Sequence, residues 1–445
     1  MCLCELLVHL MKIISAALIC FLAWPGLAQA KPLITDSQKS YARLCLDYED
    51  SPKRLVQICE KALHQGGLSP RQWEDIMDSL AWALYDLNRD RESLAVFNEI
   101  LEQNPASPWG LAGLGWFAFF DEEYTKAVSY LEEATASRLT GKNFVLLALS
   151  RYRTSVISLD EAVLQVEAGL ALVPRFDWGW RELGWLLEDG GELEKALEAF
   201  ETAVNVNPEN KFGHYGVAWV QGELSNWQET LDAATRALEL DADYAAALSR
   251  RSLAYFKLGH SRKALQDGET LVELRPGEAD GYVRKARAQD ALGWRRLALD
   301  TLQKAEAQVG FSPYMIYWRA SLLHDEQDYP AALTQLDRIF EDAGTVPDFH
   351  DLELRALVAL DMGNLELSRA SADQALALEK ENPWAWYLEA RLLLAEGHSE
   401  DSVQAFAKAM ELGLPRDQVK TFVKRLVRYG QFLKAISVKG RYSES

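Results

Sequence analysis

Apolar and small residues recur along this chain in a fixed order, which is most complete between residues 177 and 210. Four of them fall at positions 4, 7, 8 and 11 of this stretch, a spacing that places side chains on one face of a helix. Three more follow at positions 20, 24 and 27, after a glycine at position 15 and before a proline at position 32. These residues are Trp180, Leu183, Gly184, Leu187, Gly191, Ala196, Phe200, Ala203 and Pro208. The pattern predicts two antiparallel helices joined by a short turn.

The same pattern returns about every 34 residues through most of the chain. We expect units to begin at Asp36, Glu74, Pro108, Asn143, Asp177, Lys211, Ala245, Ala279, Pro313, Phe349 and Pro383. Successive starts are 34 to 38 residues apart, and the units run from about Asp36 to Leu414. Such an array grows by adding units, so 445 residues can fold without one oversized core.

Small residues at positions 8, 20 and 27 let the two helices of a unit approach closely, while large residues at positions 4, 7, 11 and 24 fill the space between them. This arrangement resembles the tetratricopeptide repeat. The resemblance implies an all-α, right-handed superhelical solenoid of antiparallel helix pairs whose first helices line an inner groove. It also implies protein or peptide recognition as the commonest role. The first unit departs from the pattern with Arg43 at position 8, and the register is looser around Gly344.

The repeats divide the chain into four parts. We expect a signal peptide over residues 1–30, a divergent N-terminal repeat over 31–73 and a solenoid of about ten repeats over 74–415. Residues 416–445 form a basic C-terminal cap, in which a single helix over about 417–436 closes the last apolar face.

The first thirty residues have the features of an export signal. Met11 and Lys12 supply a positive start, residues 13–24 form an apolar run without charge, and Ala28-Gln29-Ala30 fits the small-x-small cleavage rule. Cleavage near Ala30 predicts a periplasmic or secreted protein, whether translation starts at Met1 or at Met11. The alternative is an uncleaved membrane anchor, for which 12 apolar residues fall short of the roughly 20 that a spanning helix needs.

Cysteine usage agrees with export. Of five cysteines, only Cys45 and Cys59 lie beyond the expected cleavage site. They occupy positions 10 and 24 of the first unit, on helices that should face each other, so we expect them to form a disulfide. Two buried free thiols are the alternative.

The net charge of −19 disfavours nucleic acid and anionic lipid as partners over most of the surface. It favours a cationic partner, or it reflects plain solubility. The charge reverses near the C-terminus, where eight basic residues and two acidic residues give a net charge of +6 from residue 416 onward. This basic segment is either a cap attracted to the acidic solenoid or the one place where membrane contact is expected.

No motif indicates catalysis. The sequence contains no phosphate-binding glycine loop, no HExxH and no GxSxG, and its histidines are scattered without ligand spacing. We therefore expect no catalytic residues, no metal site and no cofactor.

Aromatic residues are the informative feature. Positions 2, 5, 9 and 12 of a first helix share one face, away from the buried positions, and the resemblance places that face in the groove. We expect the ligand to contact aromatic and acidic residues there, namely Trp82, Tyr85, Trp109, Trp116, Phe119, Trp178, Trp185, Glu188, Asp189, Tyr215 and Trp219. Arg151 interrupts the tryptophans at position 9 and could pair with Glu188 or with a ligand carboxylate. The alternative is that these rings pack between neighbouring first helices.

These observations favour a non-catalytic periplasmic scaffold that binds a protein or peptide in an aromatic, acidic groove. Rings beside carboxylates attract cations, which would suit a basic partner. The rival hypothesis is a polysaccharide-binding or export-associated protein of the cell envelope, because tryptophan and tyrosine also stack on sugar rings. A clamp for the C-terminal carboxylate of chaperones is not expected, since family members with that clamp have Lys at position 5 and Asn at position 9, where this chain has Asp78 and Trp82.

Overall fold

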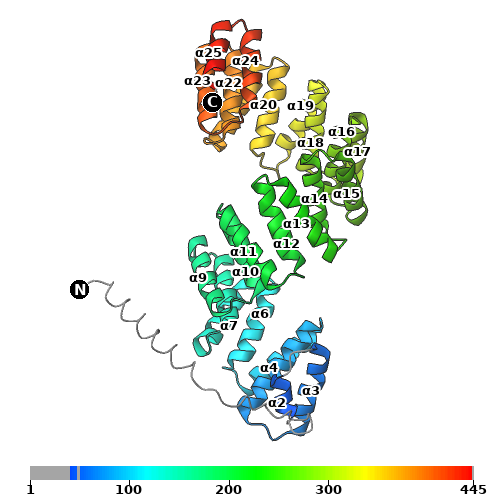
Figure 1. The fold of residues 1–445 in the computed structure, drawn as a ribbon, viewed down its shortest axis with the longest axis vertical. Helices are drawn as coiled ribbons and strands as arrows, with labels where there is room; N and C mark the ends of the chain where they lie inside the picture. The colour runs from blue at the N-terminus through cyan, green and yellow to red at the C-terminus, as the bar shows by residue number, and fades with distance from the viewer. Residues whose placement is uncertain (1–40, 48–50, 443–445) are drawn as a thin grey trace, which may run out of the picture. The chain divides into compact units, whose positions relative to one another are not determined.

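The computed structural model describes residues 41–47 and 51–442. These residues form helices α2 to α25 in sequence order, with no strand among them (Figure 1). The expected signal peptide and the start at Asp36 lie outside the described residues. In the part of the chain that is described, no helix is both long enough and apolar enough to cross a membrane.

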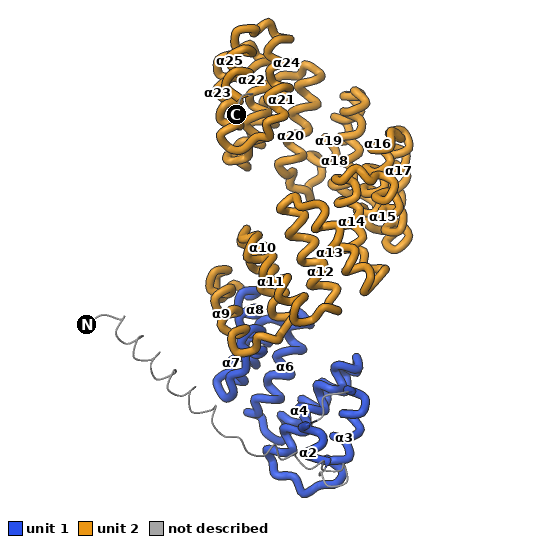
Figure 2. Tube along the Cα trace, viewed as in Figure 1, with its two compact units in different colours: residues 1–154 blue, residues 155–445 orange. Residues whose placement is uncertain are grey.

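The chain divides into two compact units, residues 1–154 and 155–445 (Figure 2). The first unit contains α2 (Tyr41–Asp47), α3 (Pro52–Gln65), α4 (Pro70–Asp86), α5 (Asp90–Gln103), α6 (Pro108–Phe120), α7 (Tyr124–Ser137) and α8 (Gly141–Arg153). Consecutive helices pack against one another, so this unit is a stack of helix pairs.

The second unit is a stack of the same kind. Its helices are α9 (Leu159–Leu172), α10 (Asp177–Asp189), α11 (Leu193–Val206), α12 (Lys211–Glu223), α13 (Trp227–Leu240), α14 (Ala245–Lys257), α15 (Ser261–Leu274), α16 (Ala279–Ala291), α17 (Arg295–Val309), α18 (Pro313–Asp325), α19 (Tyr329–Glu341), α20 (Phe349–Asp361), α21 (Leu365–Leu378), α22 (Pro383–Ala395), α23 (Ser399–Glu411), α24 (Asp417–Arg428) and α25 (Phe432–Tyr442).

Most of the predicted unit starts are confirmed to the residue. First helices begin at Pro108, Asp177, Lys211, Ala245, Ala279, Pro313, Phe349 and Pro383. The start expected at Glu74 is wrong by one turn, because α4 begins at Pro70. Ser69 and Gln72 form a capping box there, and Pro70 suits the first turn, so the helix starts before the repeat pattern does.

The start expected at Asn143 is also wrong, because α8 begins at Gly141 after the capping residue Thr140. The helix ends correspondingly early, and a five-residue loop over 154–158 precedes α9, whereas three residues join α10 to α11. The division between the two units falls in this loop. The shift places Arg151 at position 11 instead of position 9, where it pairs with Glu132 of α7 at 2.8 Å.

Glycines allow the core phenylalanines to lie between helices. A Cβ added to Gly216 would lie 2.2 Å from the Phe200 ring, and one added to Gly113 would lie 2.3 Å from the Phe97 ring. Each glycine is the sixth residue of a first helix, and each phenylalanine occupies position 24 of the preceding repeat, counted from the predicted start of that repeat. Each ring is fully buried, so these contacts join successive repeats within the first compact unit and within the second.

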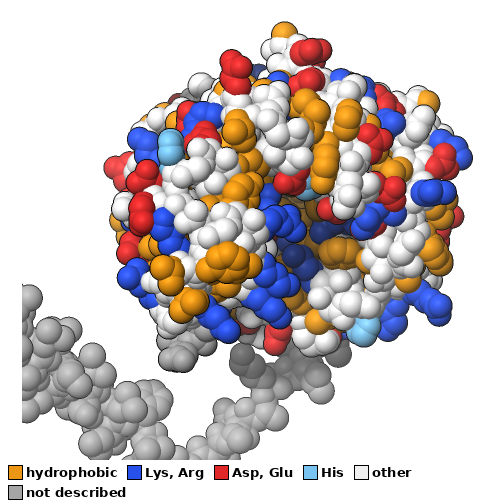
Figure 3. Space-filling view, turned by 90° about the horizontal axis from the view of Figure 1, so that it is seen from above, with side chains coloured by type: hydrophobic (Ala, Val, Ile, Leu, Met, Phe, Trp, Pro, Cys, Tyr) orange, Lys and Arg blue, Asp and Glu red, His pale blue; other side chains and the backbone are white. Residues whose placement is uncertain are grey.

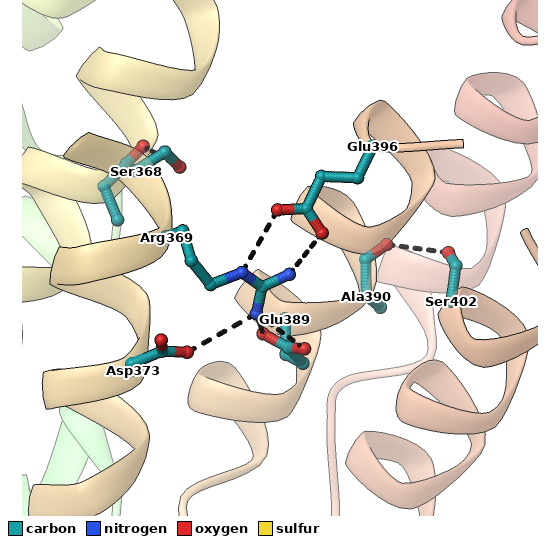
Figure 4. A network of polar contacts seen from close by, with 8 residues as sticks. Ser368, Arg369, Asp373, Glu389, Ala390, Glu396 and Ser402 are labelled. Atoms are coloured by element: carbon teal, nitrogen blue, oxygen red, sulfur yellow. Dashed lines mark hydrogen bonds and ion pairs between the residues drawn. The ribbon is translucent and has the colours of Figure 1, made fainter. Parts of the chain in front are cut away.

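Serine hydroxyls link the two helices of several repeats at the positions expected to be small. Ser252 donates to the backbone oxygen of Ala264 at 2.9 Å, and Ser402 donates to that of Ala390 at 2.7 Å. Ser402 and its acceptor are visible in Figure 4. Close approach at positions 8 and 20 therefore supports a hydrogen bond as well as apolar contact.

An arginine crosses from α21 to the next repeat in the same region of the second unit (Figure 4). Arg369 donates to Glu389 of α22 at 2.7 Å and through Nε to Glu396, the C-cap residue of that helix, at 3.1 Å. These bonds to two carboxylates raise the pKa of the Arg369 guanidinium against the lowering effect of its burial. The contact joins successive repeats through charge-assisted hydrogen bonds.

A disulfide joins Cys45 of α2 to Cys59 of α3, with the two Cα atoms 5.0 Å apart. Both residues are buried, and they belong to the apolar cluster that includes Ile76 and Phe97. The disulfide thus links the first described helix to the helix that follows it.

The expected single capping helix over 417–436 is wrong, because two helices close the stack. The helix α24 ends at Arg428 with Tyr429 as its C-cap, and Gly430 adopts a left-handed conformation with φ of 74° that turns the chain into α25. Phe422 of α24 stacks on Phe406 with ring centres 4.1 Å apart and so covers the last repeat. The cap is therefore a further helix pair.

Candidate ligand-binding groove

Some of the predicted groove residues belong to the first compact unit and the others belong to the second. In the first unit, Trp82 of α4 meets Trp116 of α6 edge to face with ring centres 5.3 Å apart. Tyr85 meets the same Trp116 at 5.8 Å, and Trp82 also contacts the buried ring of Phe97 at 5.3 Å. The three predicted aromatic side chains therefore form one half-buried cluster between neighbouring first helices.

Asp78 lies one turn before Trp82 and accepts a hydrogen bond from its indole Nε1 at 2.9 Å. Burial raises the pKa of the Asp78 carboxyl to about 7, although this bond and the charge of Arg138 act in the opposite direction. The carboxyl is thus close to half ionised at neutral pH, in a cluster otherwise made of rings.

The other predicted residues of the first unit lie differently. The guanidinium carbon of Arg138 lies over the ring of Trp109, 4.6 Å from the ring centre. Phe119 is only 8% exposed and packs against Phe120 and Tyr124, so it belongs to the packed interior and its predicted place on the groove wall is wrong.

In the second unit, Trp185 of α10 contacts Tyr215 and Trp219 of α12, with ring centres 6.0 and 6.1 Å apart. Trp185 also packs on the core ring of Phe200 at 4.7 Å. Glu188 accepts a hydrogen bond from Trp219 Nε1 at 2.9 Å, so this predicted acidic residue orients a predicted ring. The four predicted residues are therefore brought together.

Two predicted residues stand apart from that group. Trp178, near the start of α10, contacts Phe176 and lies under the guanidinium of Arg181 at 5.9 Å. Asp189 is exposed at the last residue of α10.

The tryptophans at position 9 pack as the alternative interpretation expects, whereas their contact with a ligand stays a prediction. Each contacts a core phenylalanine or a neighbouring first helix, and each keeps an exposed part. Their contacts are mostly edge to face, so few ring faces remain open for stacking with a ligand.

A cavity of about 630 Å³ opens beside Trp219 within the second unit. It lies between α12, α14 and α16 and is lined by Lys211, Tyr215, Trp219, Asp241, Asp243, Tyr244, Ala245, Ala246, Ser249, Arg250, Leu253, Leu271, Arg275, Glu278, Asp280, Gly281 and Arg284. Its volume lies within the range of pockets that hold small ligands or a few residues of peptide.

Charges of both signs line this cavity, and several of them are paired with one another. Lys211 pairs with Asp241 at 2.5 Å, and Arg284 donates to Asp280 at 3.0 Å and to the hydroxyl of Ser249 at 3.1 Å. The lining can therefore offer donors and acceptors to a polar ligand without a large net charge.

Arg250 connects the cavity to the predicted aromatic group. Its guanidinium carbon lies 3.7 Å from the ring centre of Trp219, and its Nη1 donates to Glu223 at 3.1 Å. This stacked guanidinium covers one face of the ring. Burial raises the pKa of Tyr215, and it raises that of Tyr244 to about 12, so both phenols remain protonated at neutral pH.

The half of this cavity that α14 and α16 contribute was not predicted from the sequence. Arg250 and Arg284 both occupy position 6 of their units, which is not among the four positions assigned to the groove. Two arginines at the same position of consecutive repeats were a signal that could have located the site. Among the described residues, no group of three or more His, Cys, Asp or Glu side chains is arranged to hold a metal ion.

Comparison with known proteins matches the repeats directly. Tetratricopeptide repeat models match residues 180–210 and 354–413. A crystal structure of a tetratricopeptide repeat protein from Parabacteroides merdae superposes with a TM-score of 0.50 at 16% identity, covering 61% of this chain and 98% of that one. This chain is a tetratricopeptide-repeat protein, and its fold is an all-α solenoid of such repeats. Proteins of this family generally act as protein-interaction scaffolds.

Curated relatives share part of the chain. DnaJ homolog subfamily C member 3 of Rattus norvegicus is 28% identical over 269 residues, which are 59% of this chain and 49% of the relative. The Homo sapiens protein of the same name is 26% identical over 269 residues, with the same coverage. Serine/threonine-protein phosphatase 5 of Rattus norvegicus is 33% identical over 95 residues, or 21% of this chain and 19% of the relative. The chain thus spans about half the length of the first two relatives, and less of the third.

Proposed function

We propose that this protein is a non-catalytic scaffold that binds an extended polypeptide segment in the cavity between α12, α14 and α16. The supporting observation is the lining itself, which combines the rings of Tyr215 and Trp219 with paired charges of both signs. A peptide backbone offers donors and acceptors along its whole length, and its side chains alternate in character, so such a mixed lining suits it.

A bound peptide would replace some of the ion pairs within the cavity lining with ion pairs to its own side chains. A basic side chain would compete for Asp241 or Asp280, and an acidic side chain would compete for Arg284. Because each ion pair is already formed, binding would replace one charged contact with another and would add little net electrostatic gain. Affinity would then come mainly from the rings and from backbone hydrogen bonds.

Polysaccharide binding is the rival function, and the ring geometry argues against it. Sugar rings stack on open aromatic faces, whereas Arg250 covers one face of Trp219. The rings of Trp185 and Tyr215 are turned toward their neighbours as well. The cavity therefore favours polypeptide over sugar.

A phage-displayed library of random peptides, selected on the chain from Lys31 to Ser445, tests this function. Ser249→Trp places a large ring inside the cavity, and Gln228→Trp adds the same ring to the exposed side of α13. We expect selected peptides to lose at least ten-fold in affinity for Ser249→Trp and to bind Gln228→Trp normally. Circular dichroism would verify that both variants fold. Equal binding to both variants, or binding on a glycan array without any selected peptide, would refute the proposal.

We also propose that the chain is exported and acts in the periplasm or outside the cell. The apolar run before Ala30 and the pairing of Cys45 with Cys59 both support this location. N-terminal sequencing of the protein recovered from the periplasmic fraction or the medium should give Lys31 as the first residue. A chain that stays in the cytoplasm with residues 1–30 intact would contradict it.

A further inference from the structure

The outer face of α25 is apolar although no part of the described chain covers it. Phe432, Leu433 and Ile436 are 60%, 83% and 68% exposed. On its other side, α25 buries Ala435 and Val438 in the apolar cluster that it shares with α24 and the last repeat. A helix that ends a repeat array normally presents a polar outer face, so this one requires an explanation.

Basic side chains border the same face. At 100° per residue, Leu433 and Ile436 lie opposite the buried Ala435 and Val438, with Lys439 and Arg441 on the two edges. Both of these basic residues are exposed. An apolar face with basic edges is the arrangement of helices that lie in the plane of a membrane surface.

The adjoining helix α24 extends the positive charge. Lys420, Lys424 and Arg428 are exposed on it, and residues 416–445 carry a net charge of +6 in a chain whose net charge is −19. Figure 3, which views the molecule from the end where α24 and α25 lie in Figure 1, shows Lys and Arg side chains beside apolar ones. The two features needed for attraction to anionic lipid thus meet at one end of the second unit.

The charge of this face favours an anionic membrane surface over a second copy of the chain as its partner. A symmetric dimer through α25 would place the same patch against itself, so two surfaces of positive charge would meet. Phospholipid head groups of negative charge complement the basic edges, and the acyl boundary accepts Leu433 and Ile436. The acidic remainder of the chain is kept away from such a surface by its own charge, which favours contact through this end alone.

We propose that α24 and α25 dock on the surface of a bilayer that contains anionic phospholipid. Leu433 and Ile436 enter the boundary between head groups and acyl chains, and the basic residues of the cap contact the head groups. This interaction is separate from the peptide cavity between α12 and α16, so it goes beyond the proposed function. It would hold the peptide cavity of the scaffold near a membrane surface.

Co-flotation of the chain from Lys31 to Ser445 with lipid vesicles tests the proposal. Vesicles of phosphatidylcholine mixed with phosphatidylglycerol should carry the protein upward at low salt, and vesicles of phosphatidylcholine alone should not. Added salt should reduce the bound fraction, because the contact depends on charge. Equal recovery with both kinds of vesicle, or with neither, would overturn the proposal.

Matched variants distinguish binding through this face from non-specific hydrophobic binding to vesicles. Leu433→Ser with Ile436→Ser removes the apolar face, and Leu164→Ser with Leu172→Ser removes two leucines of α9 that are 65% and 59% exposed. The first double variant should bind anionic vesicles at least ten-fold more weakly, and the second should bind as the unchanged chain does. Equal melting temperatures would show that both fold. If the α25 variant instead abolished a dimer seen by sedimentation equilibrium while leaving vesicle binding intact, the face would be a self-association surface and the proposal would be wrong.

Discussion

Replacing Asp78 by asparagine should make the first unit more stable at pH 8 and change it little at pH 4. In the fold, burial raises the pKa of the Asp78 carboxyl from 3.8 to about 7. The folded state therefore holds a proton that the unfolded chain has lost between these two pH values. Stability from this group is complete below pH 4, falls as the pH rises toward 7 and is constant above it.

The magnitude follows from the size of the shift. A difference of about 3 pKa units at about 1.4 kcal/mol each gives about 4 kcal/mol between pH 4 and pH 8. This is an upper value, because Asp78 is only partly buried and water reduces the penalty. Asparagine is neutral throughout, and its side-chain oxygen can still accept the hydrogen bond from Trp82 Nε1. The variant should therefore lack the pH dependence while keeping the local contact.

Hydrogen exchange of α4 amides measures this locally, which matters because repeat proteins open in parts. The variant and the unchanged chain are compared at the same pH, so the intrinsic exchange rate cancels. Protection of α4 should be equal at pH 4 and at least ten-fold greater in Asp78→Asn at pH 8. Asp121→Asn, which changes an exposed carboxylate in the same unit, serves as the control. An unchanged ratio of protection across this pH range would refute the reasoning.

Two further predictions concern stability. Gly216→Ala should lower the free energy of unfolding in urea by about 1 to 3 kcal/mol, because the new methyl would lie 2.2 Å from the Phe200 ring. Gly277→Ala, where no atom lies within 4 Å of the new methyl, should lower it much less. Equal losses of stability in the two variants would contradict the packing argument. For Cys45 and Cys59, alkylation of the exported, denatured and unreduced chain should label neither, and reduction should destabilise the N-terminal helices by about 3 kcal/mol in the chain-entropy model for a loop of 14 residues. Labelling of both thiols would show that the bond does not form.

The sequence could predict the repeats because their spacing depends on local rules. Small residues where helices cross and a proline before the next unit locate most first helices to the residue. The errors arose where local capping overrides the repeat pattern. Ser69 and Thr140 each begin a helix earlier than the counted start, and Gly430 divides the cap into two helices. Such effects depend on a few hydrogen bonds and one backbone angle, which a count of apolar positions does not include.

The groove was harder to predict. Helix geometry predicted that Trp185, Tyr215 and Trp219 share one face, and their rings contact one another in the structure. Their role in binding a ligand stays a prediction. Arg250 was missed because its role comes from stacking on a ring in the preceding repeat. Phe119 was assigned to the wrong environment because a small rotation about the helix axis separates the groove face from the core. Sequence periodicity fixes which helix a residue occupies more firmly than it fixes what that residue contacts.

The hydroxyl bonds between the helices of a repeat imply a constraint on which sequences can vary together. Ser252 at position 8 faces Ala264 at position 20, and the order is reversed for Ser402 and Ala390. Either position can supply the donor, because the acceptor is a backbone oxygen that every residue has. Exchanging Ser252 and Ala264 would preserve the contact with its direction inverted. When one of the two positions carries a serine, alanine at the other position is enough to form the hydrogen bond, because only its backbone oxygen takes part. Related repeats should therefore keep a serine at position 8 or at position 20, and the loss of one serine should accompany the gain of the other.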